Sequence, residues 1–321
     1  MTEHLDTWLA DAGTARELIE HGARLLDGAG VVFAHGTDNA LDESAALVLH
    51  ALDLDFGIDD RELDRALQPD QVRRARELLE LRIRTRKPAA YLTHQAWFAG
   101  MPFYVDERVL VPRSPLAELV ENRFQPWVNP DAVRGVLDLC TGSGCIGIAC
   151  AHYFPDAEVV LTDISPDALQ VAGVNIERHD LAKRVIALRS DVYSVLGARR
   201  FDMIVSNPPY VPEGELTELS EEFRYEPALG LVSGSDGLDV VVRILAGAAM
   251  HLRERGILVV EVGHVQDALV GLFPDVPFLW LDFEYGGEGV LLLERDQLLT
   301  WGARFAAVLQ ARSATRTPDM E

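Results

Sequence analysis

Residues 136–145 read Val-Leu-Asp-Leu-Cys-Thr-Gly-Ser-Gly-Cys, an apolar run that ends in an acid and opens into a glycine-rich turn. Residues 136–139 are predicted to form a strand and residues 144–153 a helix. The glycines let the backbone approach a ligand closely, and the amino end of the helix offers free amide donors. This stretch therefore predicts the first strand and helix of an α/β sheet whose connecting loop binds a ligand.

Strands and helices alternate on the carboxyl side of this loop. A helix is predicted at residues 166–178, and the last two strands, 278–283 and 289–293, are close enough to pair antiparallel. Alternation of this kind favours a doubly wound, mostly parallel sheet, so we expect an α/β, Rossmann-like fold. The intervening strands are predicted at residues 159–162, 185–188, 203–205 and 257–262.

The region before this sheet differs in texture. Residues 1–90 read as helices, beginning with a capping-box pattern at Thr14 and Glu17. Aromatic and β-branched runs around the acidic pair at residues 106–107 then predict a hairpin. After about residue 300 we expect one short apolar helix and a polar tail. The predicted organisation is a helical domain at 1–90, a hairpin linker at 91–118, a sheet domain at 119–300 and an extension at 301–321.

The charge of the chain constrains its partners. It has 321 residues with 29 basic and 51 acidic side chains, a formal net charge of −22. A field of this sign repels a nucleic-acid backbone and attracts a basic partner, so DNA is not expected to bind. The predicted helix at residues 73–87 nevertheless carries a basic face. Two interpretations of that face stay open, a solvated surface and a contact with RNA.

Cys140, Cys145 and Cys150 are spaced five residues apart, which matches neither a zinc site nor a disulfide framework. They are expected to be small apolar residues in a reducing cytoplasm. No metal site is predicted, because no His, Cys or Asp cluster has ligand spacing. Residues 1–6 lack the start of a signal peptide, and no run of about 18 apolar residues occurs, so no membrane span is expected.

An acid stands at the end of each of three successive predicted strands, at Asp138, Asp163 and Asp191. One such acid is usually a helix cap, but three beside one glycine loop favour a ligand site. Asp163 is placed to accept both hydroxyls of a ribose, and Asp191 to accept an adenine amino group while Val192 packs on the ring. Gly147 completes the spacing of a dinucleotide fingerprint, so spacing alone does not exclude NAD. The charge of Asp138 suits a cationic ligand instead, and S-adenosylmethionine is the ligand indicated.

The run Val-Ser-Asn-Pro-Pro-Tyr-Val-Pro at residues 205–212 directly follows a predicted strand. Each proline restricts the residue before it, so the turn is stiff. One interpretation is an abrupt exit from the sheet. The other is a site where the Asn207 side-chain oxygen and the Pro208 carbonyl accept both hydrogens of a planar amino group, holding its nitrogen for methyl transfer. Tyr210 would then cover that group.

Residues 138–145 together with Asn-Pro-Pro-Tyr at 207–210 resemble the class I methyltransferases that modify planar amino groups. Within that class the chain resembles the protein glutamine N-methyltransferases, over residues 10–297. The release-factor branch of that family carries Pro-Arg-Pro-x-Thr-Glu, whereas residues 112–118 read Pro-Arg-Ser-Pro-Leu-Ala-Glu. The branch that modifies protein three of the large ribosomal subunit is the more similar one, through the stretches at 35–39, 90–93, 96–98 and 103–110.

This resemblance implies an enzyme with a seven-stranded methyltransferase sheet, a helical substrate-recognition domain and S-adenosylmethionine as cofactor. Its substrate would be a glutamine side-chain amide of large-subunit ribosomal protein three, free or in pre-ribosomal particles. The catalytic residues would be Asn207, Pro208, Pro209 and Tyr210. The cofactor contacts would be Asp138, Cys140, Thr141, Gly142, Ser143, Gly144, Asp163, Ile164, Asp191, Val192 and Asn207.

Three alternatives remain beside this reading. The substrate could be a peptide chain release factor, or the chain could be a ribosome-assembly factor that binds without turnover. DNA methyltransferases use the same proline turn, but they need a strongly basic groove, which the charge of this chain disfavours.

Two further residues allow more than one interpretation. His35, with its glycine and Asp/Asn neighbours, indicates a structured turn before a helix rather than a catalytic group. Arg113 is expected either to meet the substrate main chain or to form an ion pair within the linker.

Overall fold

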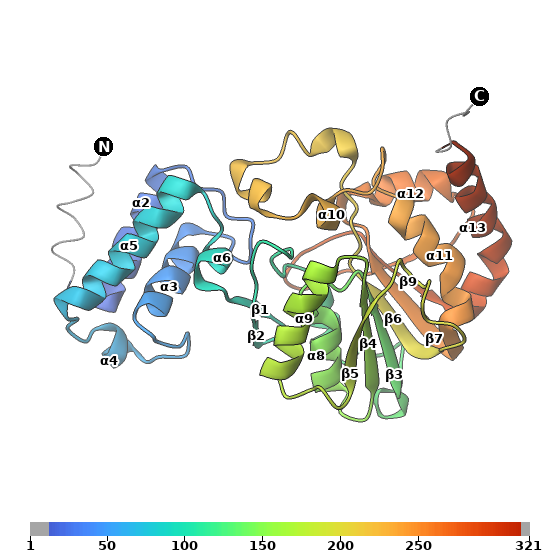
Figure 1. The fold of residues 1–321 in the computed structure, drawn as a ribbon, viewed down its shortest axis with the longest axis horizontal. Helices are drawn as coiled ribbons and strands as arrows, with labels where there is room; N and C mark the ends of the chain where they lie inside the picture. The colour runs from blue at the N-terminus through green and yellow to red at the C-terminus, as the bar shows by residue number, and fades with distance from the viewer. Residues whose placement is uncertain (1–12, 316–321) are drawn as a thin grey trace. The chain divides into compact units, whose positions relative to one another are not determined.

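The computed structural model describes residues 13–315, which form two compact units. Unit 1 extends to Ala96 and includes the later segment Leu219–Tyr225, and unit 2 holds the rest of the described chain. In Figure 1 the helices of unit 1 that precede Ala96 are blue to cyan, and the sheet of unit 2 begins in green. The chain therefore leaves unit 2 after Glu218 and returns to it at Glu226.

Unit 1 is built from helices that bury one apolar face. The Thr14 side chain accepts from the Glu17 amide and the Glu17 carboxylate accepts from the Thr14 amide, which confirms the predicted capping box. Leu18, Leu47 and Leu79 lie fully buried in a common core. The helices are α2 (Ala15–Gly28), α3 (Ala40–Ala51), α4 (Asp60–Leu63), α5 (Pro69–Thr85), α6 (Ala89–Thr93) and the 3₁₀ turn η3 (Glu221–Tyr225).

The basic face predicted on α5 is largely matched by carboxylates. Arg73, Arg74 and Arg76 form ion pairs with acids on α5 itself or near it. Such pairs lower the uncompensated positive charge that an RNA backbone would meet. This pairing favours the solvated interpretation of the face. The partner acids are Asp53, Asp70, Glu77 and Glu80.

Arg82, from the same stretch, is fully buried rather than exposed. Its Nε donates to Glu43 at 2.6 Å, and its Nη1 lies 3.6 Å from the buried Glu222. Its Nη2 donates to the Val32 carbonyl at 3.1 Å. Since a buried charge needs partners, Arg82 ties α3 and the segment Leu219–Tyr225 into unit 1.

The predicted hairpin forms, but its turn lies elsewhere. β1 (Ala96–Phe98) and β2 (Met101–Phe103) are joined by Ala99 and Gly100, whose φ angles are 47° and 70°. Two residues in the left-handed region are what a two-residue hairpin turn requires. The turn expected at residues 106–107 is therefore wrong. Asp106 instead accepts hydrogen bonds from the Tyr104 hydroxyl at 2.9 Å and from Arg108 at 2.6 Å, which hold this part of the linker outside the hairpin.

Within the described residues, unit 2 contains a seven-stranded sheet in the order β5-β4-β3-β6-β7-β9-β8. β3 pairs in parallel with both β4 and β6, while β9 is antiparallel to β7 and β8. The predicted doubly wound α/β fold is confirmed, although β8 is shorter than residues 278–283. The strands are β3 (Gly135–Leu139), β4 (Glu158–Asp163), β5 (Val185–Arg189), β6 (Phe201–Ser206), β7 (Leu252–Glu261), β8 (Leu279–Trp280) and β9 (Val290–Glu294).

Alternate residues of each central strand enter separate cores on the two faces of the sheet. In β3, Val136 joins one core, and Leu137 and Leu139 join the other. Strands buried on both faces read as continuous apolar runs, which is why they were recognisable in the sequence. Figure 1 shows α8 and α9 on one side and α11 and α13 on the other. The bounds are α7 (Leu116–Glu121), η1 (Pro130–Ala132), α8 (Cys145–Tyr153), α9 (Pro166–Arg178), η2 (Glu213–Glu215), α10 (Ala228–Leu231), α11 (Asp239–His251), η4 (Gly263–Val265) and α12 (Gln266–Leu272).

The carboxyl-terminal helix is longer than expected. α13 covers Arg295–Thr315, so the prediction of one short helix after about residue 300 is wrong. Phe305 is fully buried beside Phe273, with ring centroids 5.1 Å apart. Near the end of the helix, Arg312 forms ion pairs with Asp236 and Asp239. These contacts with distant residues hold the helix where local apolar periodicity is weak.

We predict that Arg82→Met lowers the free energy of unfolding of unit 1 by about 3–5 kcal/mol, because it leaves Glu43 and Glu222 buried without their cation. Urea unfolding followed by circular dichroism would measure this loss. The matched control is Arg73→Met on the same helix, whose pairs are solvent-exposed and whose loss should leave the transition unchanged. Equal effects of the two substitutions would contradict the assignment.

Candidate active site

The glycine loop after β3 is braced by the last polar residue of that strand. Asp138 is fully buried, and its Oδ2 accepts from the Thr141 hydroxyl at 2.5 Å and from the Gly147 amide at 2.9 Å. A Cβ on Gly147 would lie 2.1 Å from Leu161, so this glycine serves close helix packing. The Oδ1 of Asp138 is buried and has no hydrogen-bond partner among the described residues. Burial raises the pKa of Asp138 to about 7.

Asp163, at the end of β4, is joined to the same loop. Its Oδ2 accepts from the Gly142 amide at 2.9 Å, and its Oδ1 accepts from the Ser165 amide at 2.9 Å. Each carboxylate oxygen has two lone pairs, so both oxygens retain capacity for a ribose hydroxyl. Burial raises the pKa of Asp163. The next residue, Ile164, is a large apolar side chain left 44% exposed, which suits contact with a ligand ring.

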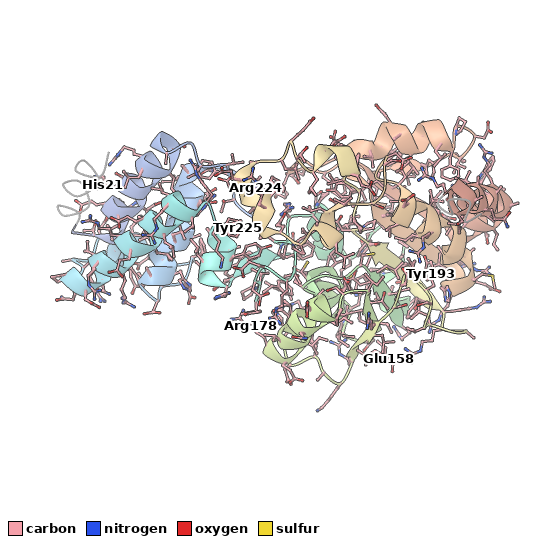
Figure 2. All side chains as sticks on the ribbon, turned by 45° about the horizontal axis from the view of Figure 1, so that its top comes forward. His21, Glu158, Arg178, Tyr193, Arg224 and Tyr225 are labelled. Atoms are coloured by element: carbon pink, nitrogen blue, oxygen red, sulfur yellow. The ribbon has the colours of Figure 1, made fainter. Side chains whose placement is uncertain are left out.

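The third acid lies in a more exposed setting. Asp191 forms an ion pair with Arg243 at 2.7 Å, and both side chains are partly exposed. Val192 has a φ of 52°, which is strained for a β-branched residue, and its side chain is buried in the core on the α11 face. Tyr193, labelled in Figure 2, donates to the Ile244 carbonyl of α11 at 3.0 Å. These contacts fix the loop after β5, while the predicted contacts of Asp191 and Val192 with adenine stay predictions.

The proline turn leaves β6 beside the glycine loop. β6 neighbours β3, and the Ser206 hydroxyl donates to the Leu139 carbonyl at 2.7 Å. Asn207 and Pro209 are partly exposed, whereas Pro208 is buried. The sheet therefore brings the Asn-Pro-Pro-Tyr turn and the glycine loop to the same edge, as the sequence predicts.

Tyr210 is held by close backbone neighbours. Its ring lies against Gly263, where a Cβ would approach the ring to 2.7 Å, and its carbonyl lies against Gly237, where a Cβ would approach to 2.1 Å. Burial raises the pKa of the Tyr210 phenol, so it stays protonated at neutral pH. The edge of the ring also meets His264, which pairs with Glu215 at 3.0 Å.

A fourth acid, Glu261, was missed in the sequence. It is the last residue of β7 and only 4% exposed. Its carboxylate accepts from the Ser114 hydroxyl at 2.5 Å and from the Tyr210 hydroxyl at 3.1 Å. Burial raises the pKa of Glu261 to about 7, and the hydrogen bonds from Ser114 and Tyr210, the charge of Arg113 and the nearby Asn207 side chain oppose that rise. The strand-end rule that found the other three acids would also have found this one.

Arg113, which is partly exposed, pairs with the buried acid Glu226. Both of its terminal nitrogens donate to Glu226, at 2.5 and 2.6 Å, and Glu226 also accepts from the Val111 amide at 3.0 Å. Arg113 thus forms an ion pair, as one interpretation expected, but with an acid of the sheet domain and not within the linker. This ion pair anchors the segment in which Ser114 donates its hydrogen bond to Glu261.

His35, Cys145 and Cys150, which the sequence also singled out, are buried residues that pack within the fold. His35 is buried against Phe223, with ring centroids 4.5 Å apart, in the turn that precedes α3, as predicted. Cys145 and Cys150 are buried, and burial raises the pKa of both thiols. Among residues 13–315, no group of three His, Cys, Asp or Glu side chains has the arrangement of a metal site. Within the same residues, no helix is long and apolar enough to cross a bilayer.

The residues on this edge fit a cationic adenosine derivative. Backbone amides at the amino end of α8 and the carboxylate of Asp163 supply donors and acceptors, and the buried Asp138 adds negative charge beside the loop. A pyrophosphate would be repelled by the two acids.

Comparison with known proteins assigns this chain to a family. Residues 122–228 match a family model described as methyltransferase small domain. A "Ribosomal protein uL3 glutamine methyltransferase" from Francisella tularensis is 46% identical over 92% of this chain and 95% of its own length. Proteins of the same name from Xanthomonas campestris and Neisseria meningitidis are 45% and 44% identical, over 93% and 89% of this chain and 97% and 94% of their own. The chain belongs to this family. It is a methyltransferase with the seven-stranded class I sheet, and S-adenosylmethionine is its cofactor.

A more distant likeness is to a solved structure of the Thermus thermophilus 16S rRNA N2 G1207 methyltransferase in complex with AdoMet and guanosine. The two are 24% identical, with a TM-score of 0.43 over 62% of this chain and 49% of that one.

We predict that Asp138→Asn in this methyltransferase weakens S-adenosylmethionine binding by roughly 10–100-fold, because a charged acceptor is lost, and leaves adenosine binding unchanged. The amide oxygen can still accept from Thr141 and Gly147, so the loop should persist. Isothermal titration with both ligands measures the difference. Equal affinity of the variant for S-adenosylmethionine would mean that Asp138 only braces the loop.

The same substitution should affect stability in a pH-dependent way. The folded-state pKa of Asp138 is raised from 3.8 to about 7, so ionisation in the wild type costs stability progressively between about pH 4 and 7. Asp138→Asn removes this cost. We expect the thermal midpoint of the variant to exceed that of the wild type by more at pH 8 than at pH 5.

Proposed function

We propose that the protein methylates the side-chain amide nitrogen of a glutamine in ribosomal protein uL3. The single observation that carries the proposal is that Asn207, at the carboxyl end of β6, lies next to the strand that ends in the glycine loop. The names of the three relatives support uL3 as the substrate. We also propose that the enzyme acts in the cytoplasm.

The residues of the turn have separate tasks in this mechanism. S-adenosylmethionine supplies an electrophilic methyl group when it is bound. The Oδ1 of Asn207 and the carbonyl of Pro208 accept the two hydrogens of the glutamine amide, which fixes its plane and raises the electron density on nitrogen. The glutamine nitrogen would become positive as it takes up the methyl group, and these two oxygens would stabilise that charge. One proton then leaves to water, without a side-chain base.

The surroundings of the turn support a rigid site. Pro208 and Pro209 restrict the backbone, and Tyr210 is fixed between its hydrogen bond to Glu261 and the glycine at residue 263. A planar substrate group therefore meets acceptors whose positions are set before it binds. Such preorganisation is worth more than flexible contacts of the same kind.

The charge of the chain also fits a protein substrate. A net charge of −22 attracts a basic protein such as a ribosomal one and repels DNA. We propose uL3, either free or in a particle not yet closed around it, as the species that is recognised. Ribosomal RNA contact through α5 is less favoured, since Arg73, Arg74 and Arg76 are paired with acids.

We predict that the purified protein transfers label from S-adenosylmethionine to one glutamine of unmodified uL3, and that Asn207→Ala lowers kcat on the order of 100-fold while S-adenosylmethionine still binds. Mass spectrometry of the labelled peptide identifies the residue. The matched control is Asn122→Ala, an exposed asparagine after α7, which should keep full activity. Near-normal turnover by Asn207→Ala would contradict the mechanism.

A second substrate test separates the open alternatives. We expect uL3 to be labelled, and a peptide chain release factor and DNA to remain at background under the same conditions. Label on the release factor alone would move the enzyme to that branch. Cofactor binding without label on any of the three would favour an assembly factor.

A further inference from the structure

Glu261 lies where a strand of apolar residues would be expected to end in another apolar residue. The residues before it in β7, Leu258, Val259 and Val260, are fully buried. Ser206 of β6 pairs with Val260, so Asn207 and Glu261 are the next residues on two adjacent parallel strands. A carboxylate is thus buried directly beside the amide that the proposed mechanism uses.

The side chains that hydrogen-bond to Glu261 are both donors. Ser114 and Tyr210 donate through their hydroxyls, and the Asn207 side chain interacts in the direction that lowers the pKa of the acid. The charge of Arg113 also lowers the pKa of Glu261, while its guanidinium forms an ion pair with Glu226. Among the described residues the carboxylate is therefore held by two neutral hydroxyls, with the Asn207 side chain beside it, and forms no salt bridge.

The interaction with Asn207 has a defined direction. An ionised carboxylate only accepts hydrogen bonds, and the only donor in an asparagine side chain is the Nδ2 amino group, so Nδ2 is the end of the Asn207 amide that can bond to the neighbouring Glu261. If Nδ2 points toward Glu261, the other end of the amide, Oδ1, points away from it. Oδ1 is the atom that the substrate amino group needs, since two amino groups facing each other cannot form a hydrogen bond.

We propose that Glu261 is a positioning residue, whose carboxylate holds the Asn207 amide by Nδ2 so that Oδ1 faces the glutamine nitrogen. This inference rests on the proposed function. The prolines of the turn fix the backbone of Asn207 but leave its terminal torsion free, and that torsion is broad and roughly two-fold. Glu261 selects one of the two amide orientations, and the contacts with Ser114 and Tyr210 hold Glu261 itself in place.

Protonation of Glu261 would undo this selection. A protonated acid can donate to Asn207 Oδ1, which would turn Nδ2 toward the substrate and prevent binding of its amino group. The titratable or charged groups that face this cluster are Tyr210, Arg113, Glu226 and His264. We expect kcat of the wild type to fall as the pH is lowered through about 7. Glu261→Gln should lack this acidic limb, whereas His264→Gln should retain it.

The first test is the kinetics of Glu261→Gln on uL3. We expect kcat to fall by roughly 10–100-fold. The dissociation constant of S-adenosylmethionine should change less than about two-fold, because the glycine loop and Asp163 are untouched by the substitution. Glu294→Gln, at the exposed end of the neighbouring strand β9, is the matched control and should keep full activity. A kcat within about two-fold of the wild type for Glu261→Gln would overturn the proposal.

A double-mutant cycle shows whether Glu261 acts through Asn207. If it does, the double variant Asn207→Ala with Glu261→Gln should be no slower than Asn207→Ala alone. Multiplicative losses would mean that Glu261 supports the fold or the cofactor site by another route, and would overturn the proposal.

The last test does not depend on the substrate or on the folding of Glu261→Gln. In ¹⁵N-labelled wild type, the side-chain amide signals of Asn207, assigned by their absence in Asn207→Ala, should shift as the pH crosses about 7. Signals that stay constant through this range would overturn the role of Glu261. If the wild type fails to methylate uL3, the proposed function falls while this titration still decides the position of the amide.

Discussion

Parallel strands all end at the same edge of a sheet, and in this protein that edge carries Asp138, Asp163, Asn207 and Glu261. The glycine loop, the proline turn and the linker segment with Ser114 are each attached to one of these side chains. The apolar faces of the same strands form the two cores, so the packing that stabilises the sheet also sets the spacing of the polar groups. The position of each polar group at the edge is therefore a consequence of the sheet register.

Two of these side chains oppose the stability of the fold that holds them. Burial raises the pKa of both Asp138 and Glu261 to about 7, so their ionised forms are disfavoured in the folded protein at neutral pH. Hydrogen bonds from Thr141, Gly147 and Ser114 reduce this cost without removing it. Apolar residues would be more stable in both positions, and the acids make sense only if ligand and substrate need their charge.

The sequence predicted this edge well because the relevant signals are local. A strand followed by an acid, a glycine loop or a proline turn lies within a few consecutive residues, which is sufficient to place Asp138, Asp163 and Asn207. The partners of Glu261 are not local, since Ser114 precedes it by 147 residues and Tyr210 by 51. The same limit explains α13, whose Arg312 pairs with Asp236 far earlier in the chain. The prediction placed the hairpin turn at the wrong residues because Ala99 has a positive φ, which an alanine in the sequence does not indicate.

A stiff backbone does not by itself orient an amide. The prolines after Asn207 determine where its Cα lies and in which direction its Cβ leaves, yet rotation of the terminal amide exchanges an acceptor for a donor at almost no steric cost. A recognition site for an amino group therefore needs a second group that distinguishes the two ends of the amide. A buried carboxylate does so more strongly than a neutral acceptor, because a hydrogen bond to a charged group is roughly twice as strong. The proline turn and the acid on the adjacent strand thus solve complementary parts of one geometric problem, the first for the main chain and the second for the side chain.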